Sequence, residues 1–182
     1  MPKRVAIPVL LLAGLFWVSS AGATSYTVVS SLDGAQETPP VITLGTGTLT
    51  GTYDDETNVL TWSGSFSALT GTTTDAHFHG PAAEGEGPAG VLVPITEAGG
   101  GDVFPLDVMA GSYSGTATLS ALNETRLLDG LIYINIHSTF RPGGEIRGQV
   151  YATAVPEAGT LGLLGIGLGL AGLARTRSRR SA

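Results

Sequence analysis

All three histidines of the chain lie in two short segments whose side chains could bind a transition metal. His77 and His79 stand two residues apart in AHFHGPA (76–82), and His137 lies in INIHSTFRPGGEIRGQ (134–149). Imidazoles two residues apart on a β-strand point to the same side, so both can reach one ion. A histidine from a neighbouring strand would complete a three-histidine site of a kind that suits zinc or copper.

Strand periodicity predicts a polar patch around these histidines. In 131–137 the isoleucines alternate with Tyr133, Asn135 and His137, and in 145–150 apolar residues alternate with Glu145 and Arg147. If the apolar sides of these strands enter the core, their polar sides turn outward. Should the strands be neighbours, we expect Asn135, Glu145 and Arg147 to lie beside His77, His79 and His137.

Two interpretations of this cluster remain open. In the first, the histidines form a hydrogen-bonded ladder with loop carbonyls, and Arg147 pairs with Glu145. In the second, the three imidazoles bind zinc or copper. We expect a close cluster in either case, and we favour the ladder, with no resident cofactor.

The elements that must position these residues are β-strands. Short runs rich in Val, Ile, Thr and aromatic residues are separated by Gly, Pro, Asp and Asn, which is typical of strands and their turns. The predicted strands are 25–31, 45–53, 59–69, 75–79, 91–94, 111–118, 131–137 and 145–151, with a hairpin turn at 53–58 and one short helix at 121–129. Many short strands at this spacing predict an all-β fold, a single β-sandwich or Greek-key barrel.

Composition limits what this domain can bind. Residues 24–153 form one domain of ordinary size, with three arginines against fourteen Asp and Glu residues, a formal charge of −11. Such a surface repels phosphate backbones, so we expect no nucleic-acid partner. The chain has no cysteine, so packing and hydrogen bonds must hold the domain together without disulfides.

The N-terminal segment has the features of a secretory signal peptide. Lys3 and Arg4 precede an apolar run, and small residues in an A-x-A arrangement end at Ala23. We therefore expect residues 1–23 to direct export and to be removed. The alternative is an uncleaved N-terminal anchor.

The C-terminal segment, 154–182, has the features of a membrane-linked sorting tail. Residues 158–174 are uncharged and long enough to span a bilayer as a helix, and four arginines follow, which places the C-terminus in the cytoplasm. With Pro156 and Glu157 before it, this tail resembles the PEP-CTERM sorting signal of Gram-negative bacteria. The resemblance implies recognition and tail removal by an exosortase-type enzyme, whereas a plain single-pass anchor is the alternative. We expect the domain to lie outside the inner membrane, and then at the cell surface or beyond it.

The central domain itself resembles the CHRD family, named for its repeats in chordin. The resemblance is carried by three motifs in order: LDGAQETPPVITLGTGTLTG (32–51), AHFHGPA and GLIYINIHSTFRPGGEIRGQV (130–150). For bacterial members it implies an exported β-domain of unassigned activity.

The sequence is compatible with two classes of function. The first is a non-enzymatic binding or structural module at the cell surface or in the extracellular matrix, with exopolysaccharide or envelope proteins as partners. The second is a metal-binding protein with a histidine site that holds zinc or copper and could be redox-active. The sequence shows no catalytic residue set, which favours a non-enzymatic module, and a metal-dependent redox or hydrolytic activity at the histidines is the alternative.

Overall fold

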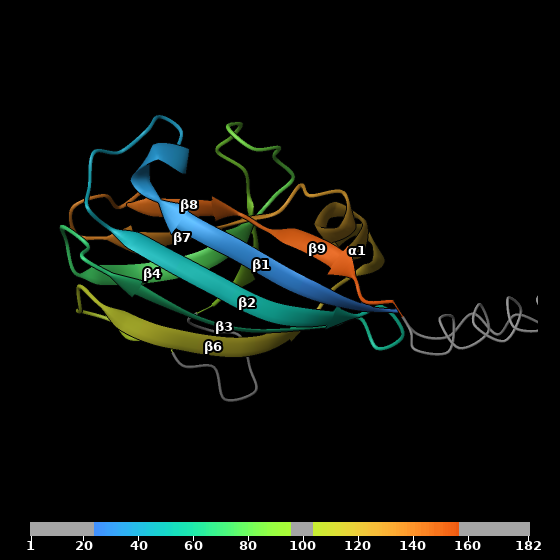
Figure 1. Cartoon of the computed structure of the whole chain (residues 1–182). Coiled ribbons are helices and arrows are strands. Elements are labelled where there is room, and N and C mark those ends of the chain that lie inside the picture. Colours follow the sequence, from blue (N-terminus) through green and yellow to red (C-terminus); the bar gives the residue numbers. More distant parts are fainter. Residues whose placement is uncertain (1–23, 96–103, 157–182) are drawn as a thin grey trace, which may run out of the picture.

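The computed structural model describes residues 24–95 and 104–156, which form one antiparallel sheet of nine strands and a short helix (Figure 1). The strands are β1 (Ser25–Asp33), β2 (Thr46–Asp54), β3 (Val59–Ser67), β4 (Thr73–His79), β5 (Val91–Pro94), β6 (Gly111–Thr118), β7 (Tyr133–Ser138), β8 (Ile146–Gln149) and β9 (Tyr151–Ala154). The helix α1 spans Ala121–Leu128, and a single 3-10 turn, η1, spans Gly34–Gln36.

The sheet curls into a nearly closed barrel. Its strand order is β5-β4-β7-β8-β1-β2-β3-β6, and β9 continues the edge of β1 beyond β8. Trp62 on β3 meets Phe78 on β4 edge-on, with ring centroids 5.1 Å apart, although these strands lie far apart in the strand order. Such contacts across the interior show that the curled sheet encloses one apolar core.

Alternation along the strands builds this core, as the sequence predicts. In β3, Leu60, Trp62 and Phe66 are buried while the serines and threonine between them are exposed. On β7 and β4, Ile134 and Phe78 are register partners and are also buried in the core. The hydrophobic effect of burying this side of each strand is the main term that stabilises the fold.

The predicted all-β fold is confirmed, as are its strands with small shifts at their ends. The run predicted as one strand at 145–151 is two strands: β8 lies between β7 and β1, its pairing with β7 ends at Gln149, and from Tyr151 the chain pairs with β1 alone as β9. The predicted helix is confirmed as α1, which begins at its N-cap Ser120. The turn at 53–58 joins β2 to β3, with Asn58 in the left-handed backbone region that asparagine tolerates.

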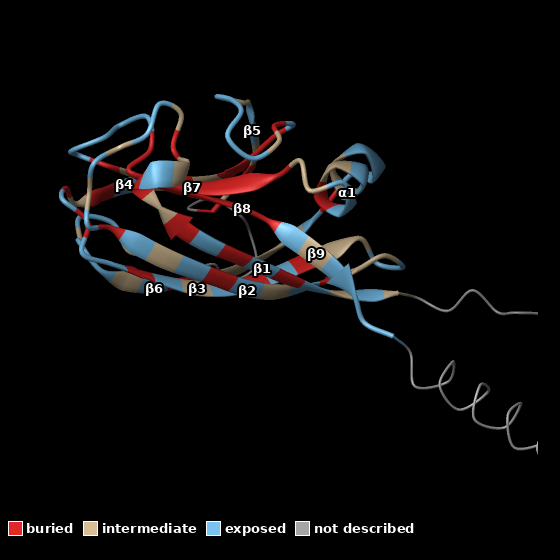
Figure 2. Cartoon of the chain, turned by 45° about the horizontal axis from the view of Figure 1, so that its top comes forward, coloured by how far each residue is buried: buried red, intermediate tan, exposed pale blue. Residues whose placement is uncertain are grey.

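Strands β7 and β8 differ from the rest because they are buried on both faces (Figure 2). One face packs into the apolar core, and chain segments that follow β1, β4 and β7 cover the other. The segments are 34–45, 80–90 and 139–144, and together they cover the side chains of the predicted polar patch.

The two predicted terminal segments, 1–23 and 158–174, lie outside the described residues. Among the residues that are described, the structure contains no helix long and apolar enough to cross a membrane.

Candidate metal centre

The three histidines come together because β4 and β7 are antiparallel neighbours. The register pairs Asp75 with His137, His77 with Asn135 and His79 with Tyr133. His77 and His79 therefore share one face of β4, and His137 lies diagonally across from His77 on the same face of the sheet. The predicted clustering of the three histidines is confirmed.

The imidazole rings are close enough to hold one ion between them. The ring centroids of His77 and His137 are 4.9 Å apart, those of His77 and His79 are 5.3 Å apart, and those of His79 and His137 are 6.0 Å apart. One potential ligand nitrogen from each ring lies within 4.8 Å of the other two. A metal ion would draw these nitrogens closer to a common centre.

The second nitrogen of each ring is held by a hydrogen-bond acceptor. His79 Nδ1 lies 2.9 Å from the Ala89 carbonyl oxygen, and His137 Nδ1 lies 2.8 Å from that of Pro142. His77 Nε2 lies 3.1 Å from a carboxylate oxygen of Asp75. Because carbonyl and carboxylate oxygens only accept, these three nitrogens carry the protons. The opposite nitrogens of His77 and His137 face each other, 3.0 Å apart.

Burial keeps two of these rings neutral. Desolvation lowers the pKa of His79 and likewise that of His137 below the ordinary histidine value, since burial disfavours the charged imidazolium. Neutral imidazoles are the form that ligates metals.

The prediction that the polar face points outward is wrong. Asn135 and Arg147 are only 3% and 2% exposed, because the three covering segments lie over them. Strand periodicity tells the two faces of a strand apart, but it does not reveal that loops far away in sequence will cover the second face.

Arg147 makes contacts that the sequence did not indicate. Its guanidinium carbon lies 3.5 Å from the centre of the Tyr133 ring, and its Nη1 donates to Thr38 Oγ1 at 3.1 Å. Its charge also acts on Glu37, whose pKa burial raises to about 7 although Arg147 partly offsets that rise. Glu37 and Tyr133 were not among the predicted site residues, and a glutamate in a loop gives no periodic signal.

The expected pairing of Arg147 with Glu145 is absent among the described residues. Glu145 is fully buried and instead accepts hydrogen bonds from the side chains of Ser138 and Thr43 and from the backbone N–H groups of Thr70 and Gly71. Burial alone would raise its pKa, but these four bonds together lower it. Glu145 lies just before β8 begins, so the alternation of the strand does not extend to it.

A family model described as the CHRD domain matches residues 28–150, which contain the whole histidine cluster and every strand except β9 and the start of β1. The chain belongs to the CHRD family. No curated protein and no solved structure matches the chain. The CHRD domain seen here is thus an antiparallel, nearly closed β-barrel in which β4 and β7 present three histidines to one point.

Pro156 of the predicted sorting motif is exposed at the end of the described chain, two residues after β9. Glu157 lies outside the described residues.

Proposed function

We propose that this CHRD domain binds one transition-metal ion, zinc or copper(II), through His77 Nδ1, His79 Nε2 and His137 Nε2. The observation that carries the proposal is the state of His79 Nε2. This atom is buried and has no hydrogen-bond partner among the described residues, while Nδ1 of the same ring is already bonded to Ala89. A buried lone pair without a donor is costly, and a metal ion would satisfy it.

The neighbouring Asn135 does not supply the missing partner. Its amide nitrogen donates to the Gly143 carbonyl at 3.4 Å, and its amide oxygen has no partner in the described part of the chain. The Asn135 side chain does interact with the His79 imidazole, but its amide oxygen only accepts and so cannot satisfy the lone pair of Nε2. The ladder favoured from the sequence accounts for the Nδ1 atoms of His79 and His137, but it leaves His79 Nε2 unexplained.

The hydrogen bonds around the cluster support the same assignment. A ligand histidine commonly donates its other N–H to a carbonyl or carboxylate, which fixes the ring and its tautomer. His79, His137 and His77 have such acceptors in Ala89, Pro142 and Asp75. His77 Nδ1 also lies 3.0 Å from His137 Nε2, a separation at which one ion could bind both nitrogens.

Three protein ligands leave a coordination position for water or another ligand. Copper(II) generally binds nitrogen sites more tightly than zinc does, so affinity alone favours copper, and metal supply outside the cell decides which ion is present.

The test is metal binding by the purified chain. After the wild-type chain has been stripped of metal with a chelator, it should take up one equivalent of Zn²⁺ or Cu²⁺, as a single site predicts. Inductively coupled plasma mass spectrometry measures the bound metal. His77→Ala, His79→Ala and His137→Ala should each remove this binding while circular dichroism stays unchanged. Asp55→Asn, which alters the acidic surface away from the cluster, is the control and should bind as wild type does. Binding that persists equally in all three histidine variants would refute the site.

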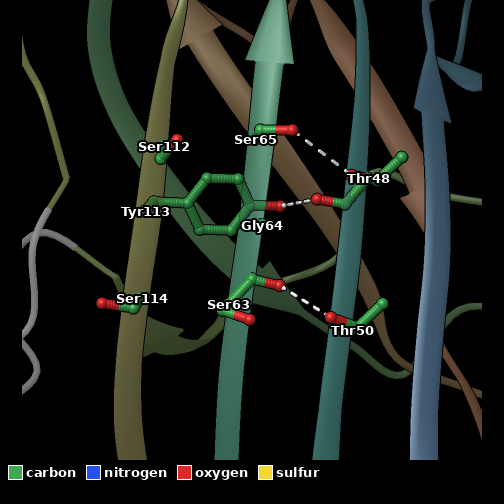
Figure 3. A pocket seen from close by; sticks show the side chains of 8 residues that line it. All are labelled: Thr48, Thr50, Ser63, Gly64, Ser65, Ser112, Tyr113 and Ser114. Atoms are coloured by element: carbon green, nitrogen blue, oxygen red, sulfur yellow. Dashed lines mark hydrogen bonds between the residues drawn. The ribbon is translucent and has the colours of Figure 1, made fainter.

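A second candidate function is a surface-binding module, and the outer face of β2, β3 and β6 favours it. Register pairing sets hydroxyl side chains in rows across these strands, among them Thr48 beside Ser65 and Thr50 beside Ser63 (Figure 3). They line a shallow hollow of ≈ 510 Å³ that has no charged residue in its lining. Uncharged hydroxyls suit a neutral exopolysaccharide or the polar surface of an envelope protein. Thr50→Lys should weaken retention on the matching immobilised polysaccharide, and equal retention would exclude this face.

We also propose that the chain is exported by residues 1–23 and held by residues 154–182 until an exosortase-type enzyme removes the tail. The A-x-A site, Pro156-Glu157, the apolar run and the final arginines support this. Intact-mass spectrometry of the native protein should show both ends missing. Finding residues 160–182 in most exported molecules would leave the simple membrane anchor instead.

A further inference from the structure

Tyr133 lies beside the histidine cluster and packs against His79. It is the register partner of His79 across β4 and β7, and it is only 3% exposed. Its ring lies parallel to the His79 imidazole, with centroids 5.1 Å apart and planes inclined by 7°. Stacking of this kind restricts how far the imidazole can tilt out of its plane.

The hydroxyl group of Tyr133 restrains the same imidazole by a second route. It accepts a hydrogen bond from the backbone N–H of Ala89 at 3.1 Å. The carbonyl of Ala89 in turn accepts the bond from His79 Nδ1 at 2.9 Å. The three residues therefore form a closed circuit in which Tyr133 holds both the face of the ring and the acceptor at its edge.

Arg147 holds Tyr133 in place from the other side. Its guanidinium carbon lies 3.5 Å from the phenol centroid, and Thr38 anchors one of its nitrogens. Arg147 is 2% exposed, and a cation over an aromatic ring is attracted more strongly when both are removed from water. The Tyr133 ring thus lies between a guanidinium and an imidazole, and it separates the positive charge of Arg147 from His79.

We infer that Tyr133, backed by Arg147, is the positioning residue of the metal site: it fixes His79 and ties the 80–90 segment to the metal ligand. The inference rests on the proposed metal function. Without the circuit, the His79 ring could rotate away from the point that His77 and His137 share, and metal binding would have to restrict that rotation. Residues that orient ligand histidines typically change metal affinity 10- to 100-fold when they are mutated.

Tyr133→Phe tests this inference, because it keeps the stacked ring and removes only the acceptor for Ala89. Calorimetric titration of the full-length chain with Zn²⁺ and with Cu²⁺ should show binding about 10- to 100-fold weaker than in wild type. Tyr113→Phe is a matched control, since Tyr113 is as buried and its hydroxyl also bonds the backbone, at the Thr48 carbonyl, away from the cluster. It should bind both ions as wild type does. Arg147→Lys keeps the charge but loses the flat guanidinium face, so it should weaken binding in the same direction.

A second measurement needs no metal. In ¹⁵N NMR spectra of the metal-free wild type, His79 should show one tautomer with the proton on Nδ1, and Tyr133→Phe should show a mixture of both tautomers. If wild type binds neither ion, the proposed metal function fails. If wild type binds an ion while Tyr133→Phe retains both its affinity and its single His79 tautomer, the metal function stands and the positioning role is refuted.

Discussion

Ile134 and Asn135 are consecutive residues of β7 that point to opposite sides of the sheet, yet they are 0% and 3% exposed. Ile134 packs in the apolar core, whereas Asn135 lies in the polar layer under the three covering segments. The same strand therefore contributes to two interiors, one apolar and one hydrogen-bonded. This double burial determines which substitutions the domain should tolerate.

Ile134→Ala should be strongly destabilising. Truncating a fully buried isoleucine loses the hydrophobic free energy of the removed atoms and leaves a cavity. The free energy of unfolding should therefore fall by about 2–5 kcal/mol. Denaturant unfolding of the metal-free chain measures this loss. A change below about 1 kcal/mol would mean that the core relaxes around the site.

Asn135→Ala should also be costly, which would not hold for a residue on a solvated face. The substitution leaves the Gly143 carbonyl without its side-chain donor and removes an amide that lies beside Glu37 and His79. We expect a loss of about 1–3 kcal/mol. Thr50→Ala, on the exposed face of β2, should change stability by less than about 0.5 kcal/mol and serves as the comparison. Equal, small losses at both positions would contradict the burial of the polar layer.

The contrast between these two residues shows how far the sequence could predict this domain. Period-2 alternation in 131–137 predicted the strand and its apolar face, because both depend on local geometry. The meeting of His137 with His77 was expected only if the two strands were neighbours, which alternation alone does not show. The same alternation could not show that Asn135 is buried, because the segments that cover it come from elsewhere in the chain. Glu145 was misplaced for a related reason: strand parity does not hold in the turn before β8. Glu37 gave no signal at all, since only the fold brings it close to Arg147.

Glu145 should contribute strongly to the stability of the domain, because it links the end of β7 to the segment that precedes β4. It accepts hydrogen bonds from Ser138 and from the backbone of Thr70 and Gly71, and Glu145→Ala leaves these donors buried without a partner. We expect a loss of about 3–5 kcal/mol, as for the removal of one member of a buried charged network. Because its pKa is lowered in the folded state, the stabilisation is present above its ordinary pKa and is lost as the pH falls through the lowered value. Acid unfolding that is identical in wild type and Glu145→Ala would contradict this role.

Glu37 should affect the pH dependence of stability in the opposite direction to Glu145. Its folded pKa of about 7 lies above the ordinary 4.5, so the folded state binds the proton more tightly. Its contribution to the free energy of unfolding is complete below pH 4.5. That contribution, up to about 3 kcal/mol, is lost as the pH rises through 7.

Glu37→Gln removes this titration and should therefore be more stable than wild type at pH 8 but not at pH 4. His79 and His137, whose pKa values are lowered, oppose Glu37 below the ordinary histidine pKa of 6.5. The measurement is therefore the difference between variant and wild type at each pH, in the presence of a chelator. A difference that does not vary with pH would show that Glu37 titrates normally.

Gly64→Ala should strain the sheet where Tyr113 crosses β3. The Tyr113 ring passes over Gly64 to donate its hydroxyl to the Thr48 carbonyl (Figure 3). An added methyl group would meet the Thr48 carbonyl oxygen first, and it would lie 2.5 Å from the ring carbon that carries the hydroxyl. Overpacking of this kind costs about 1–3 kcal/mol. Gly143→Ala is the control, because nothing lies within 4 Å of its added methyl group. Thermal unfolding that ranks the two variants equally would show that both the Tyr113 ring and the Thr48 backbone can shift to make room.

The first and last strands of the domain are partners, since Tyr26 on β1 pairs with Ala154 on β9 and the Val155 N–H donates to the Ser25 carbonyl at 2.8 Å (Figure 1). The two ends of the folded unit are therefore adjacent, and a linker of a few residues could join them without disturbing the sheet. New ends could be opened between Glu56 and Thr57, which are exposed in the turn between β2 and β3. The barrel should tolerate this circular permutation with the histidine cluster intact, because all three histidines stay within one uninterrupted stretch of the rearranged chain.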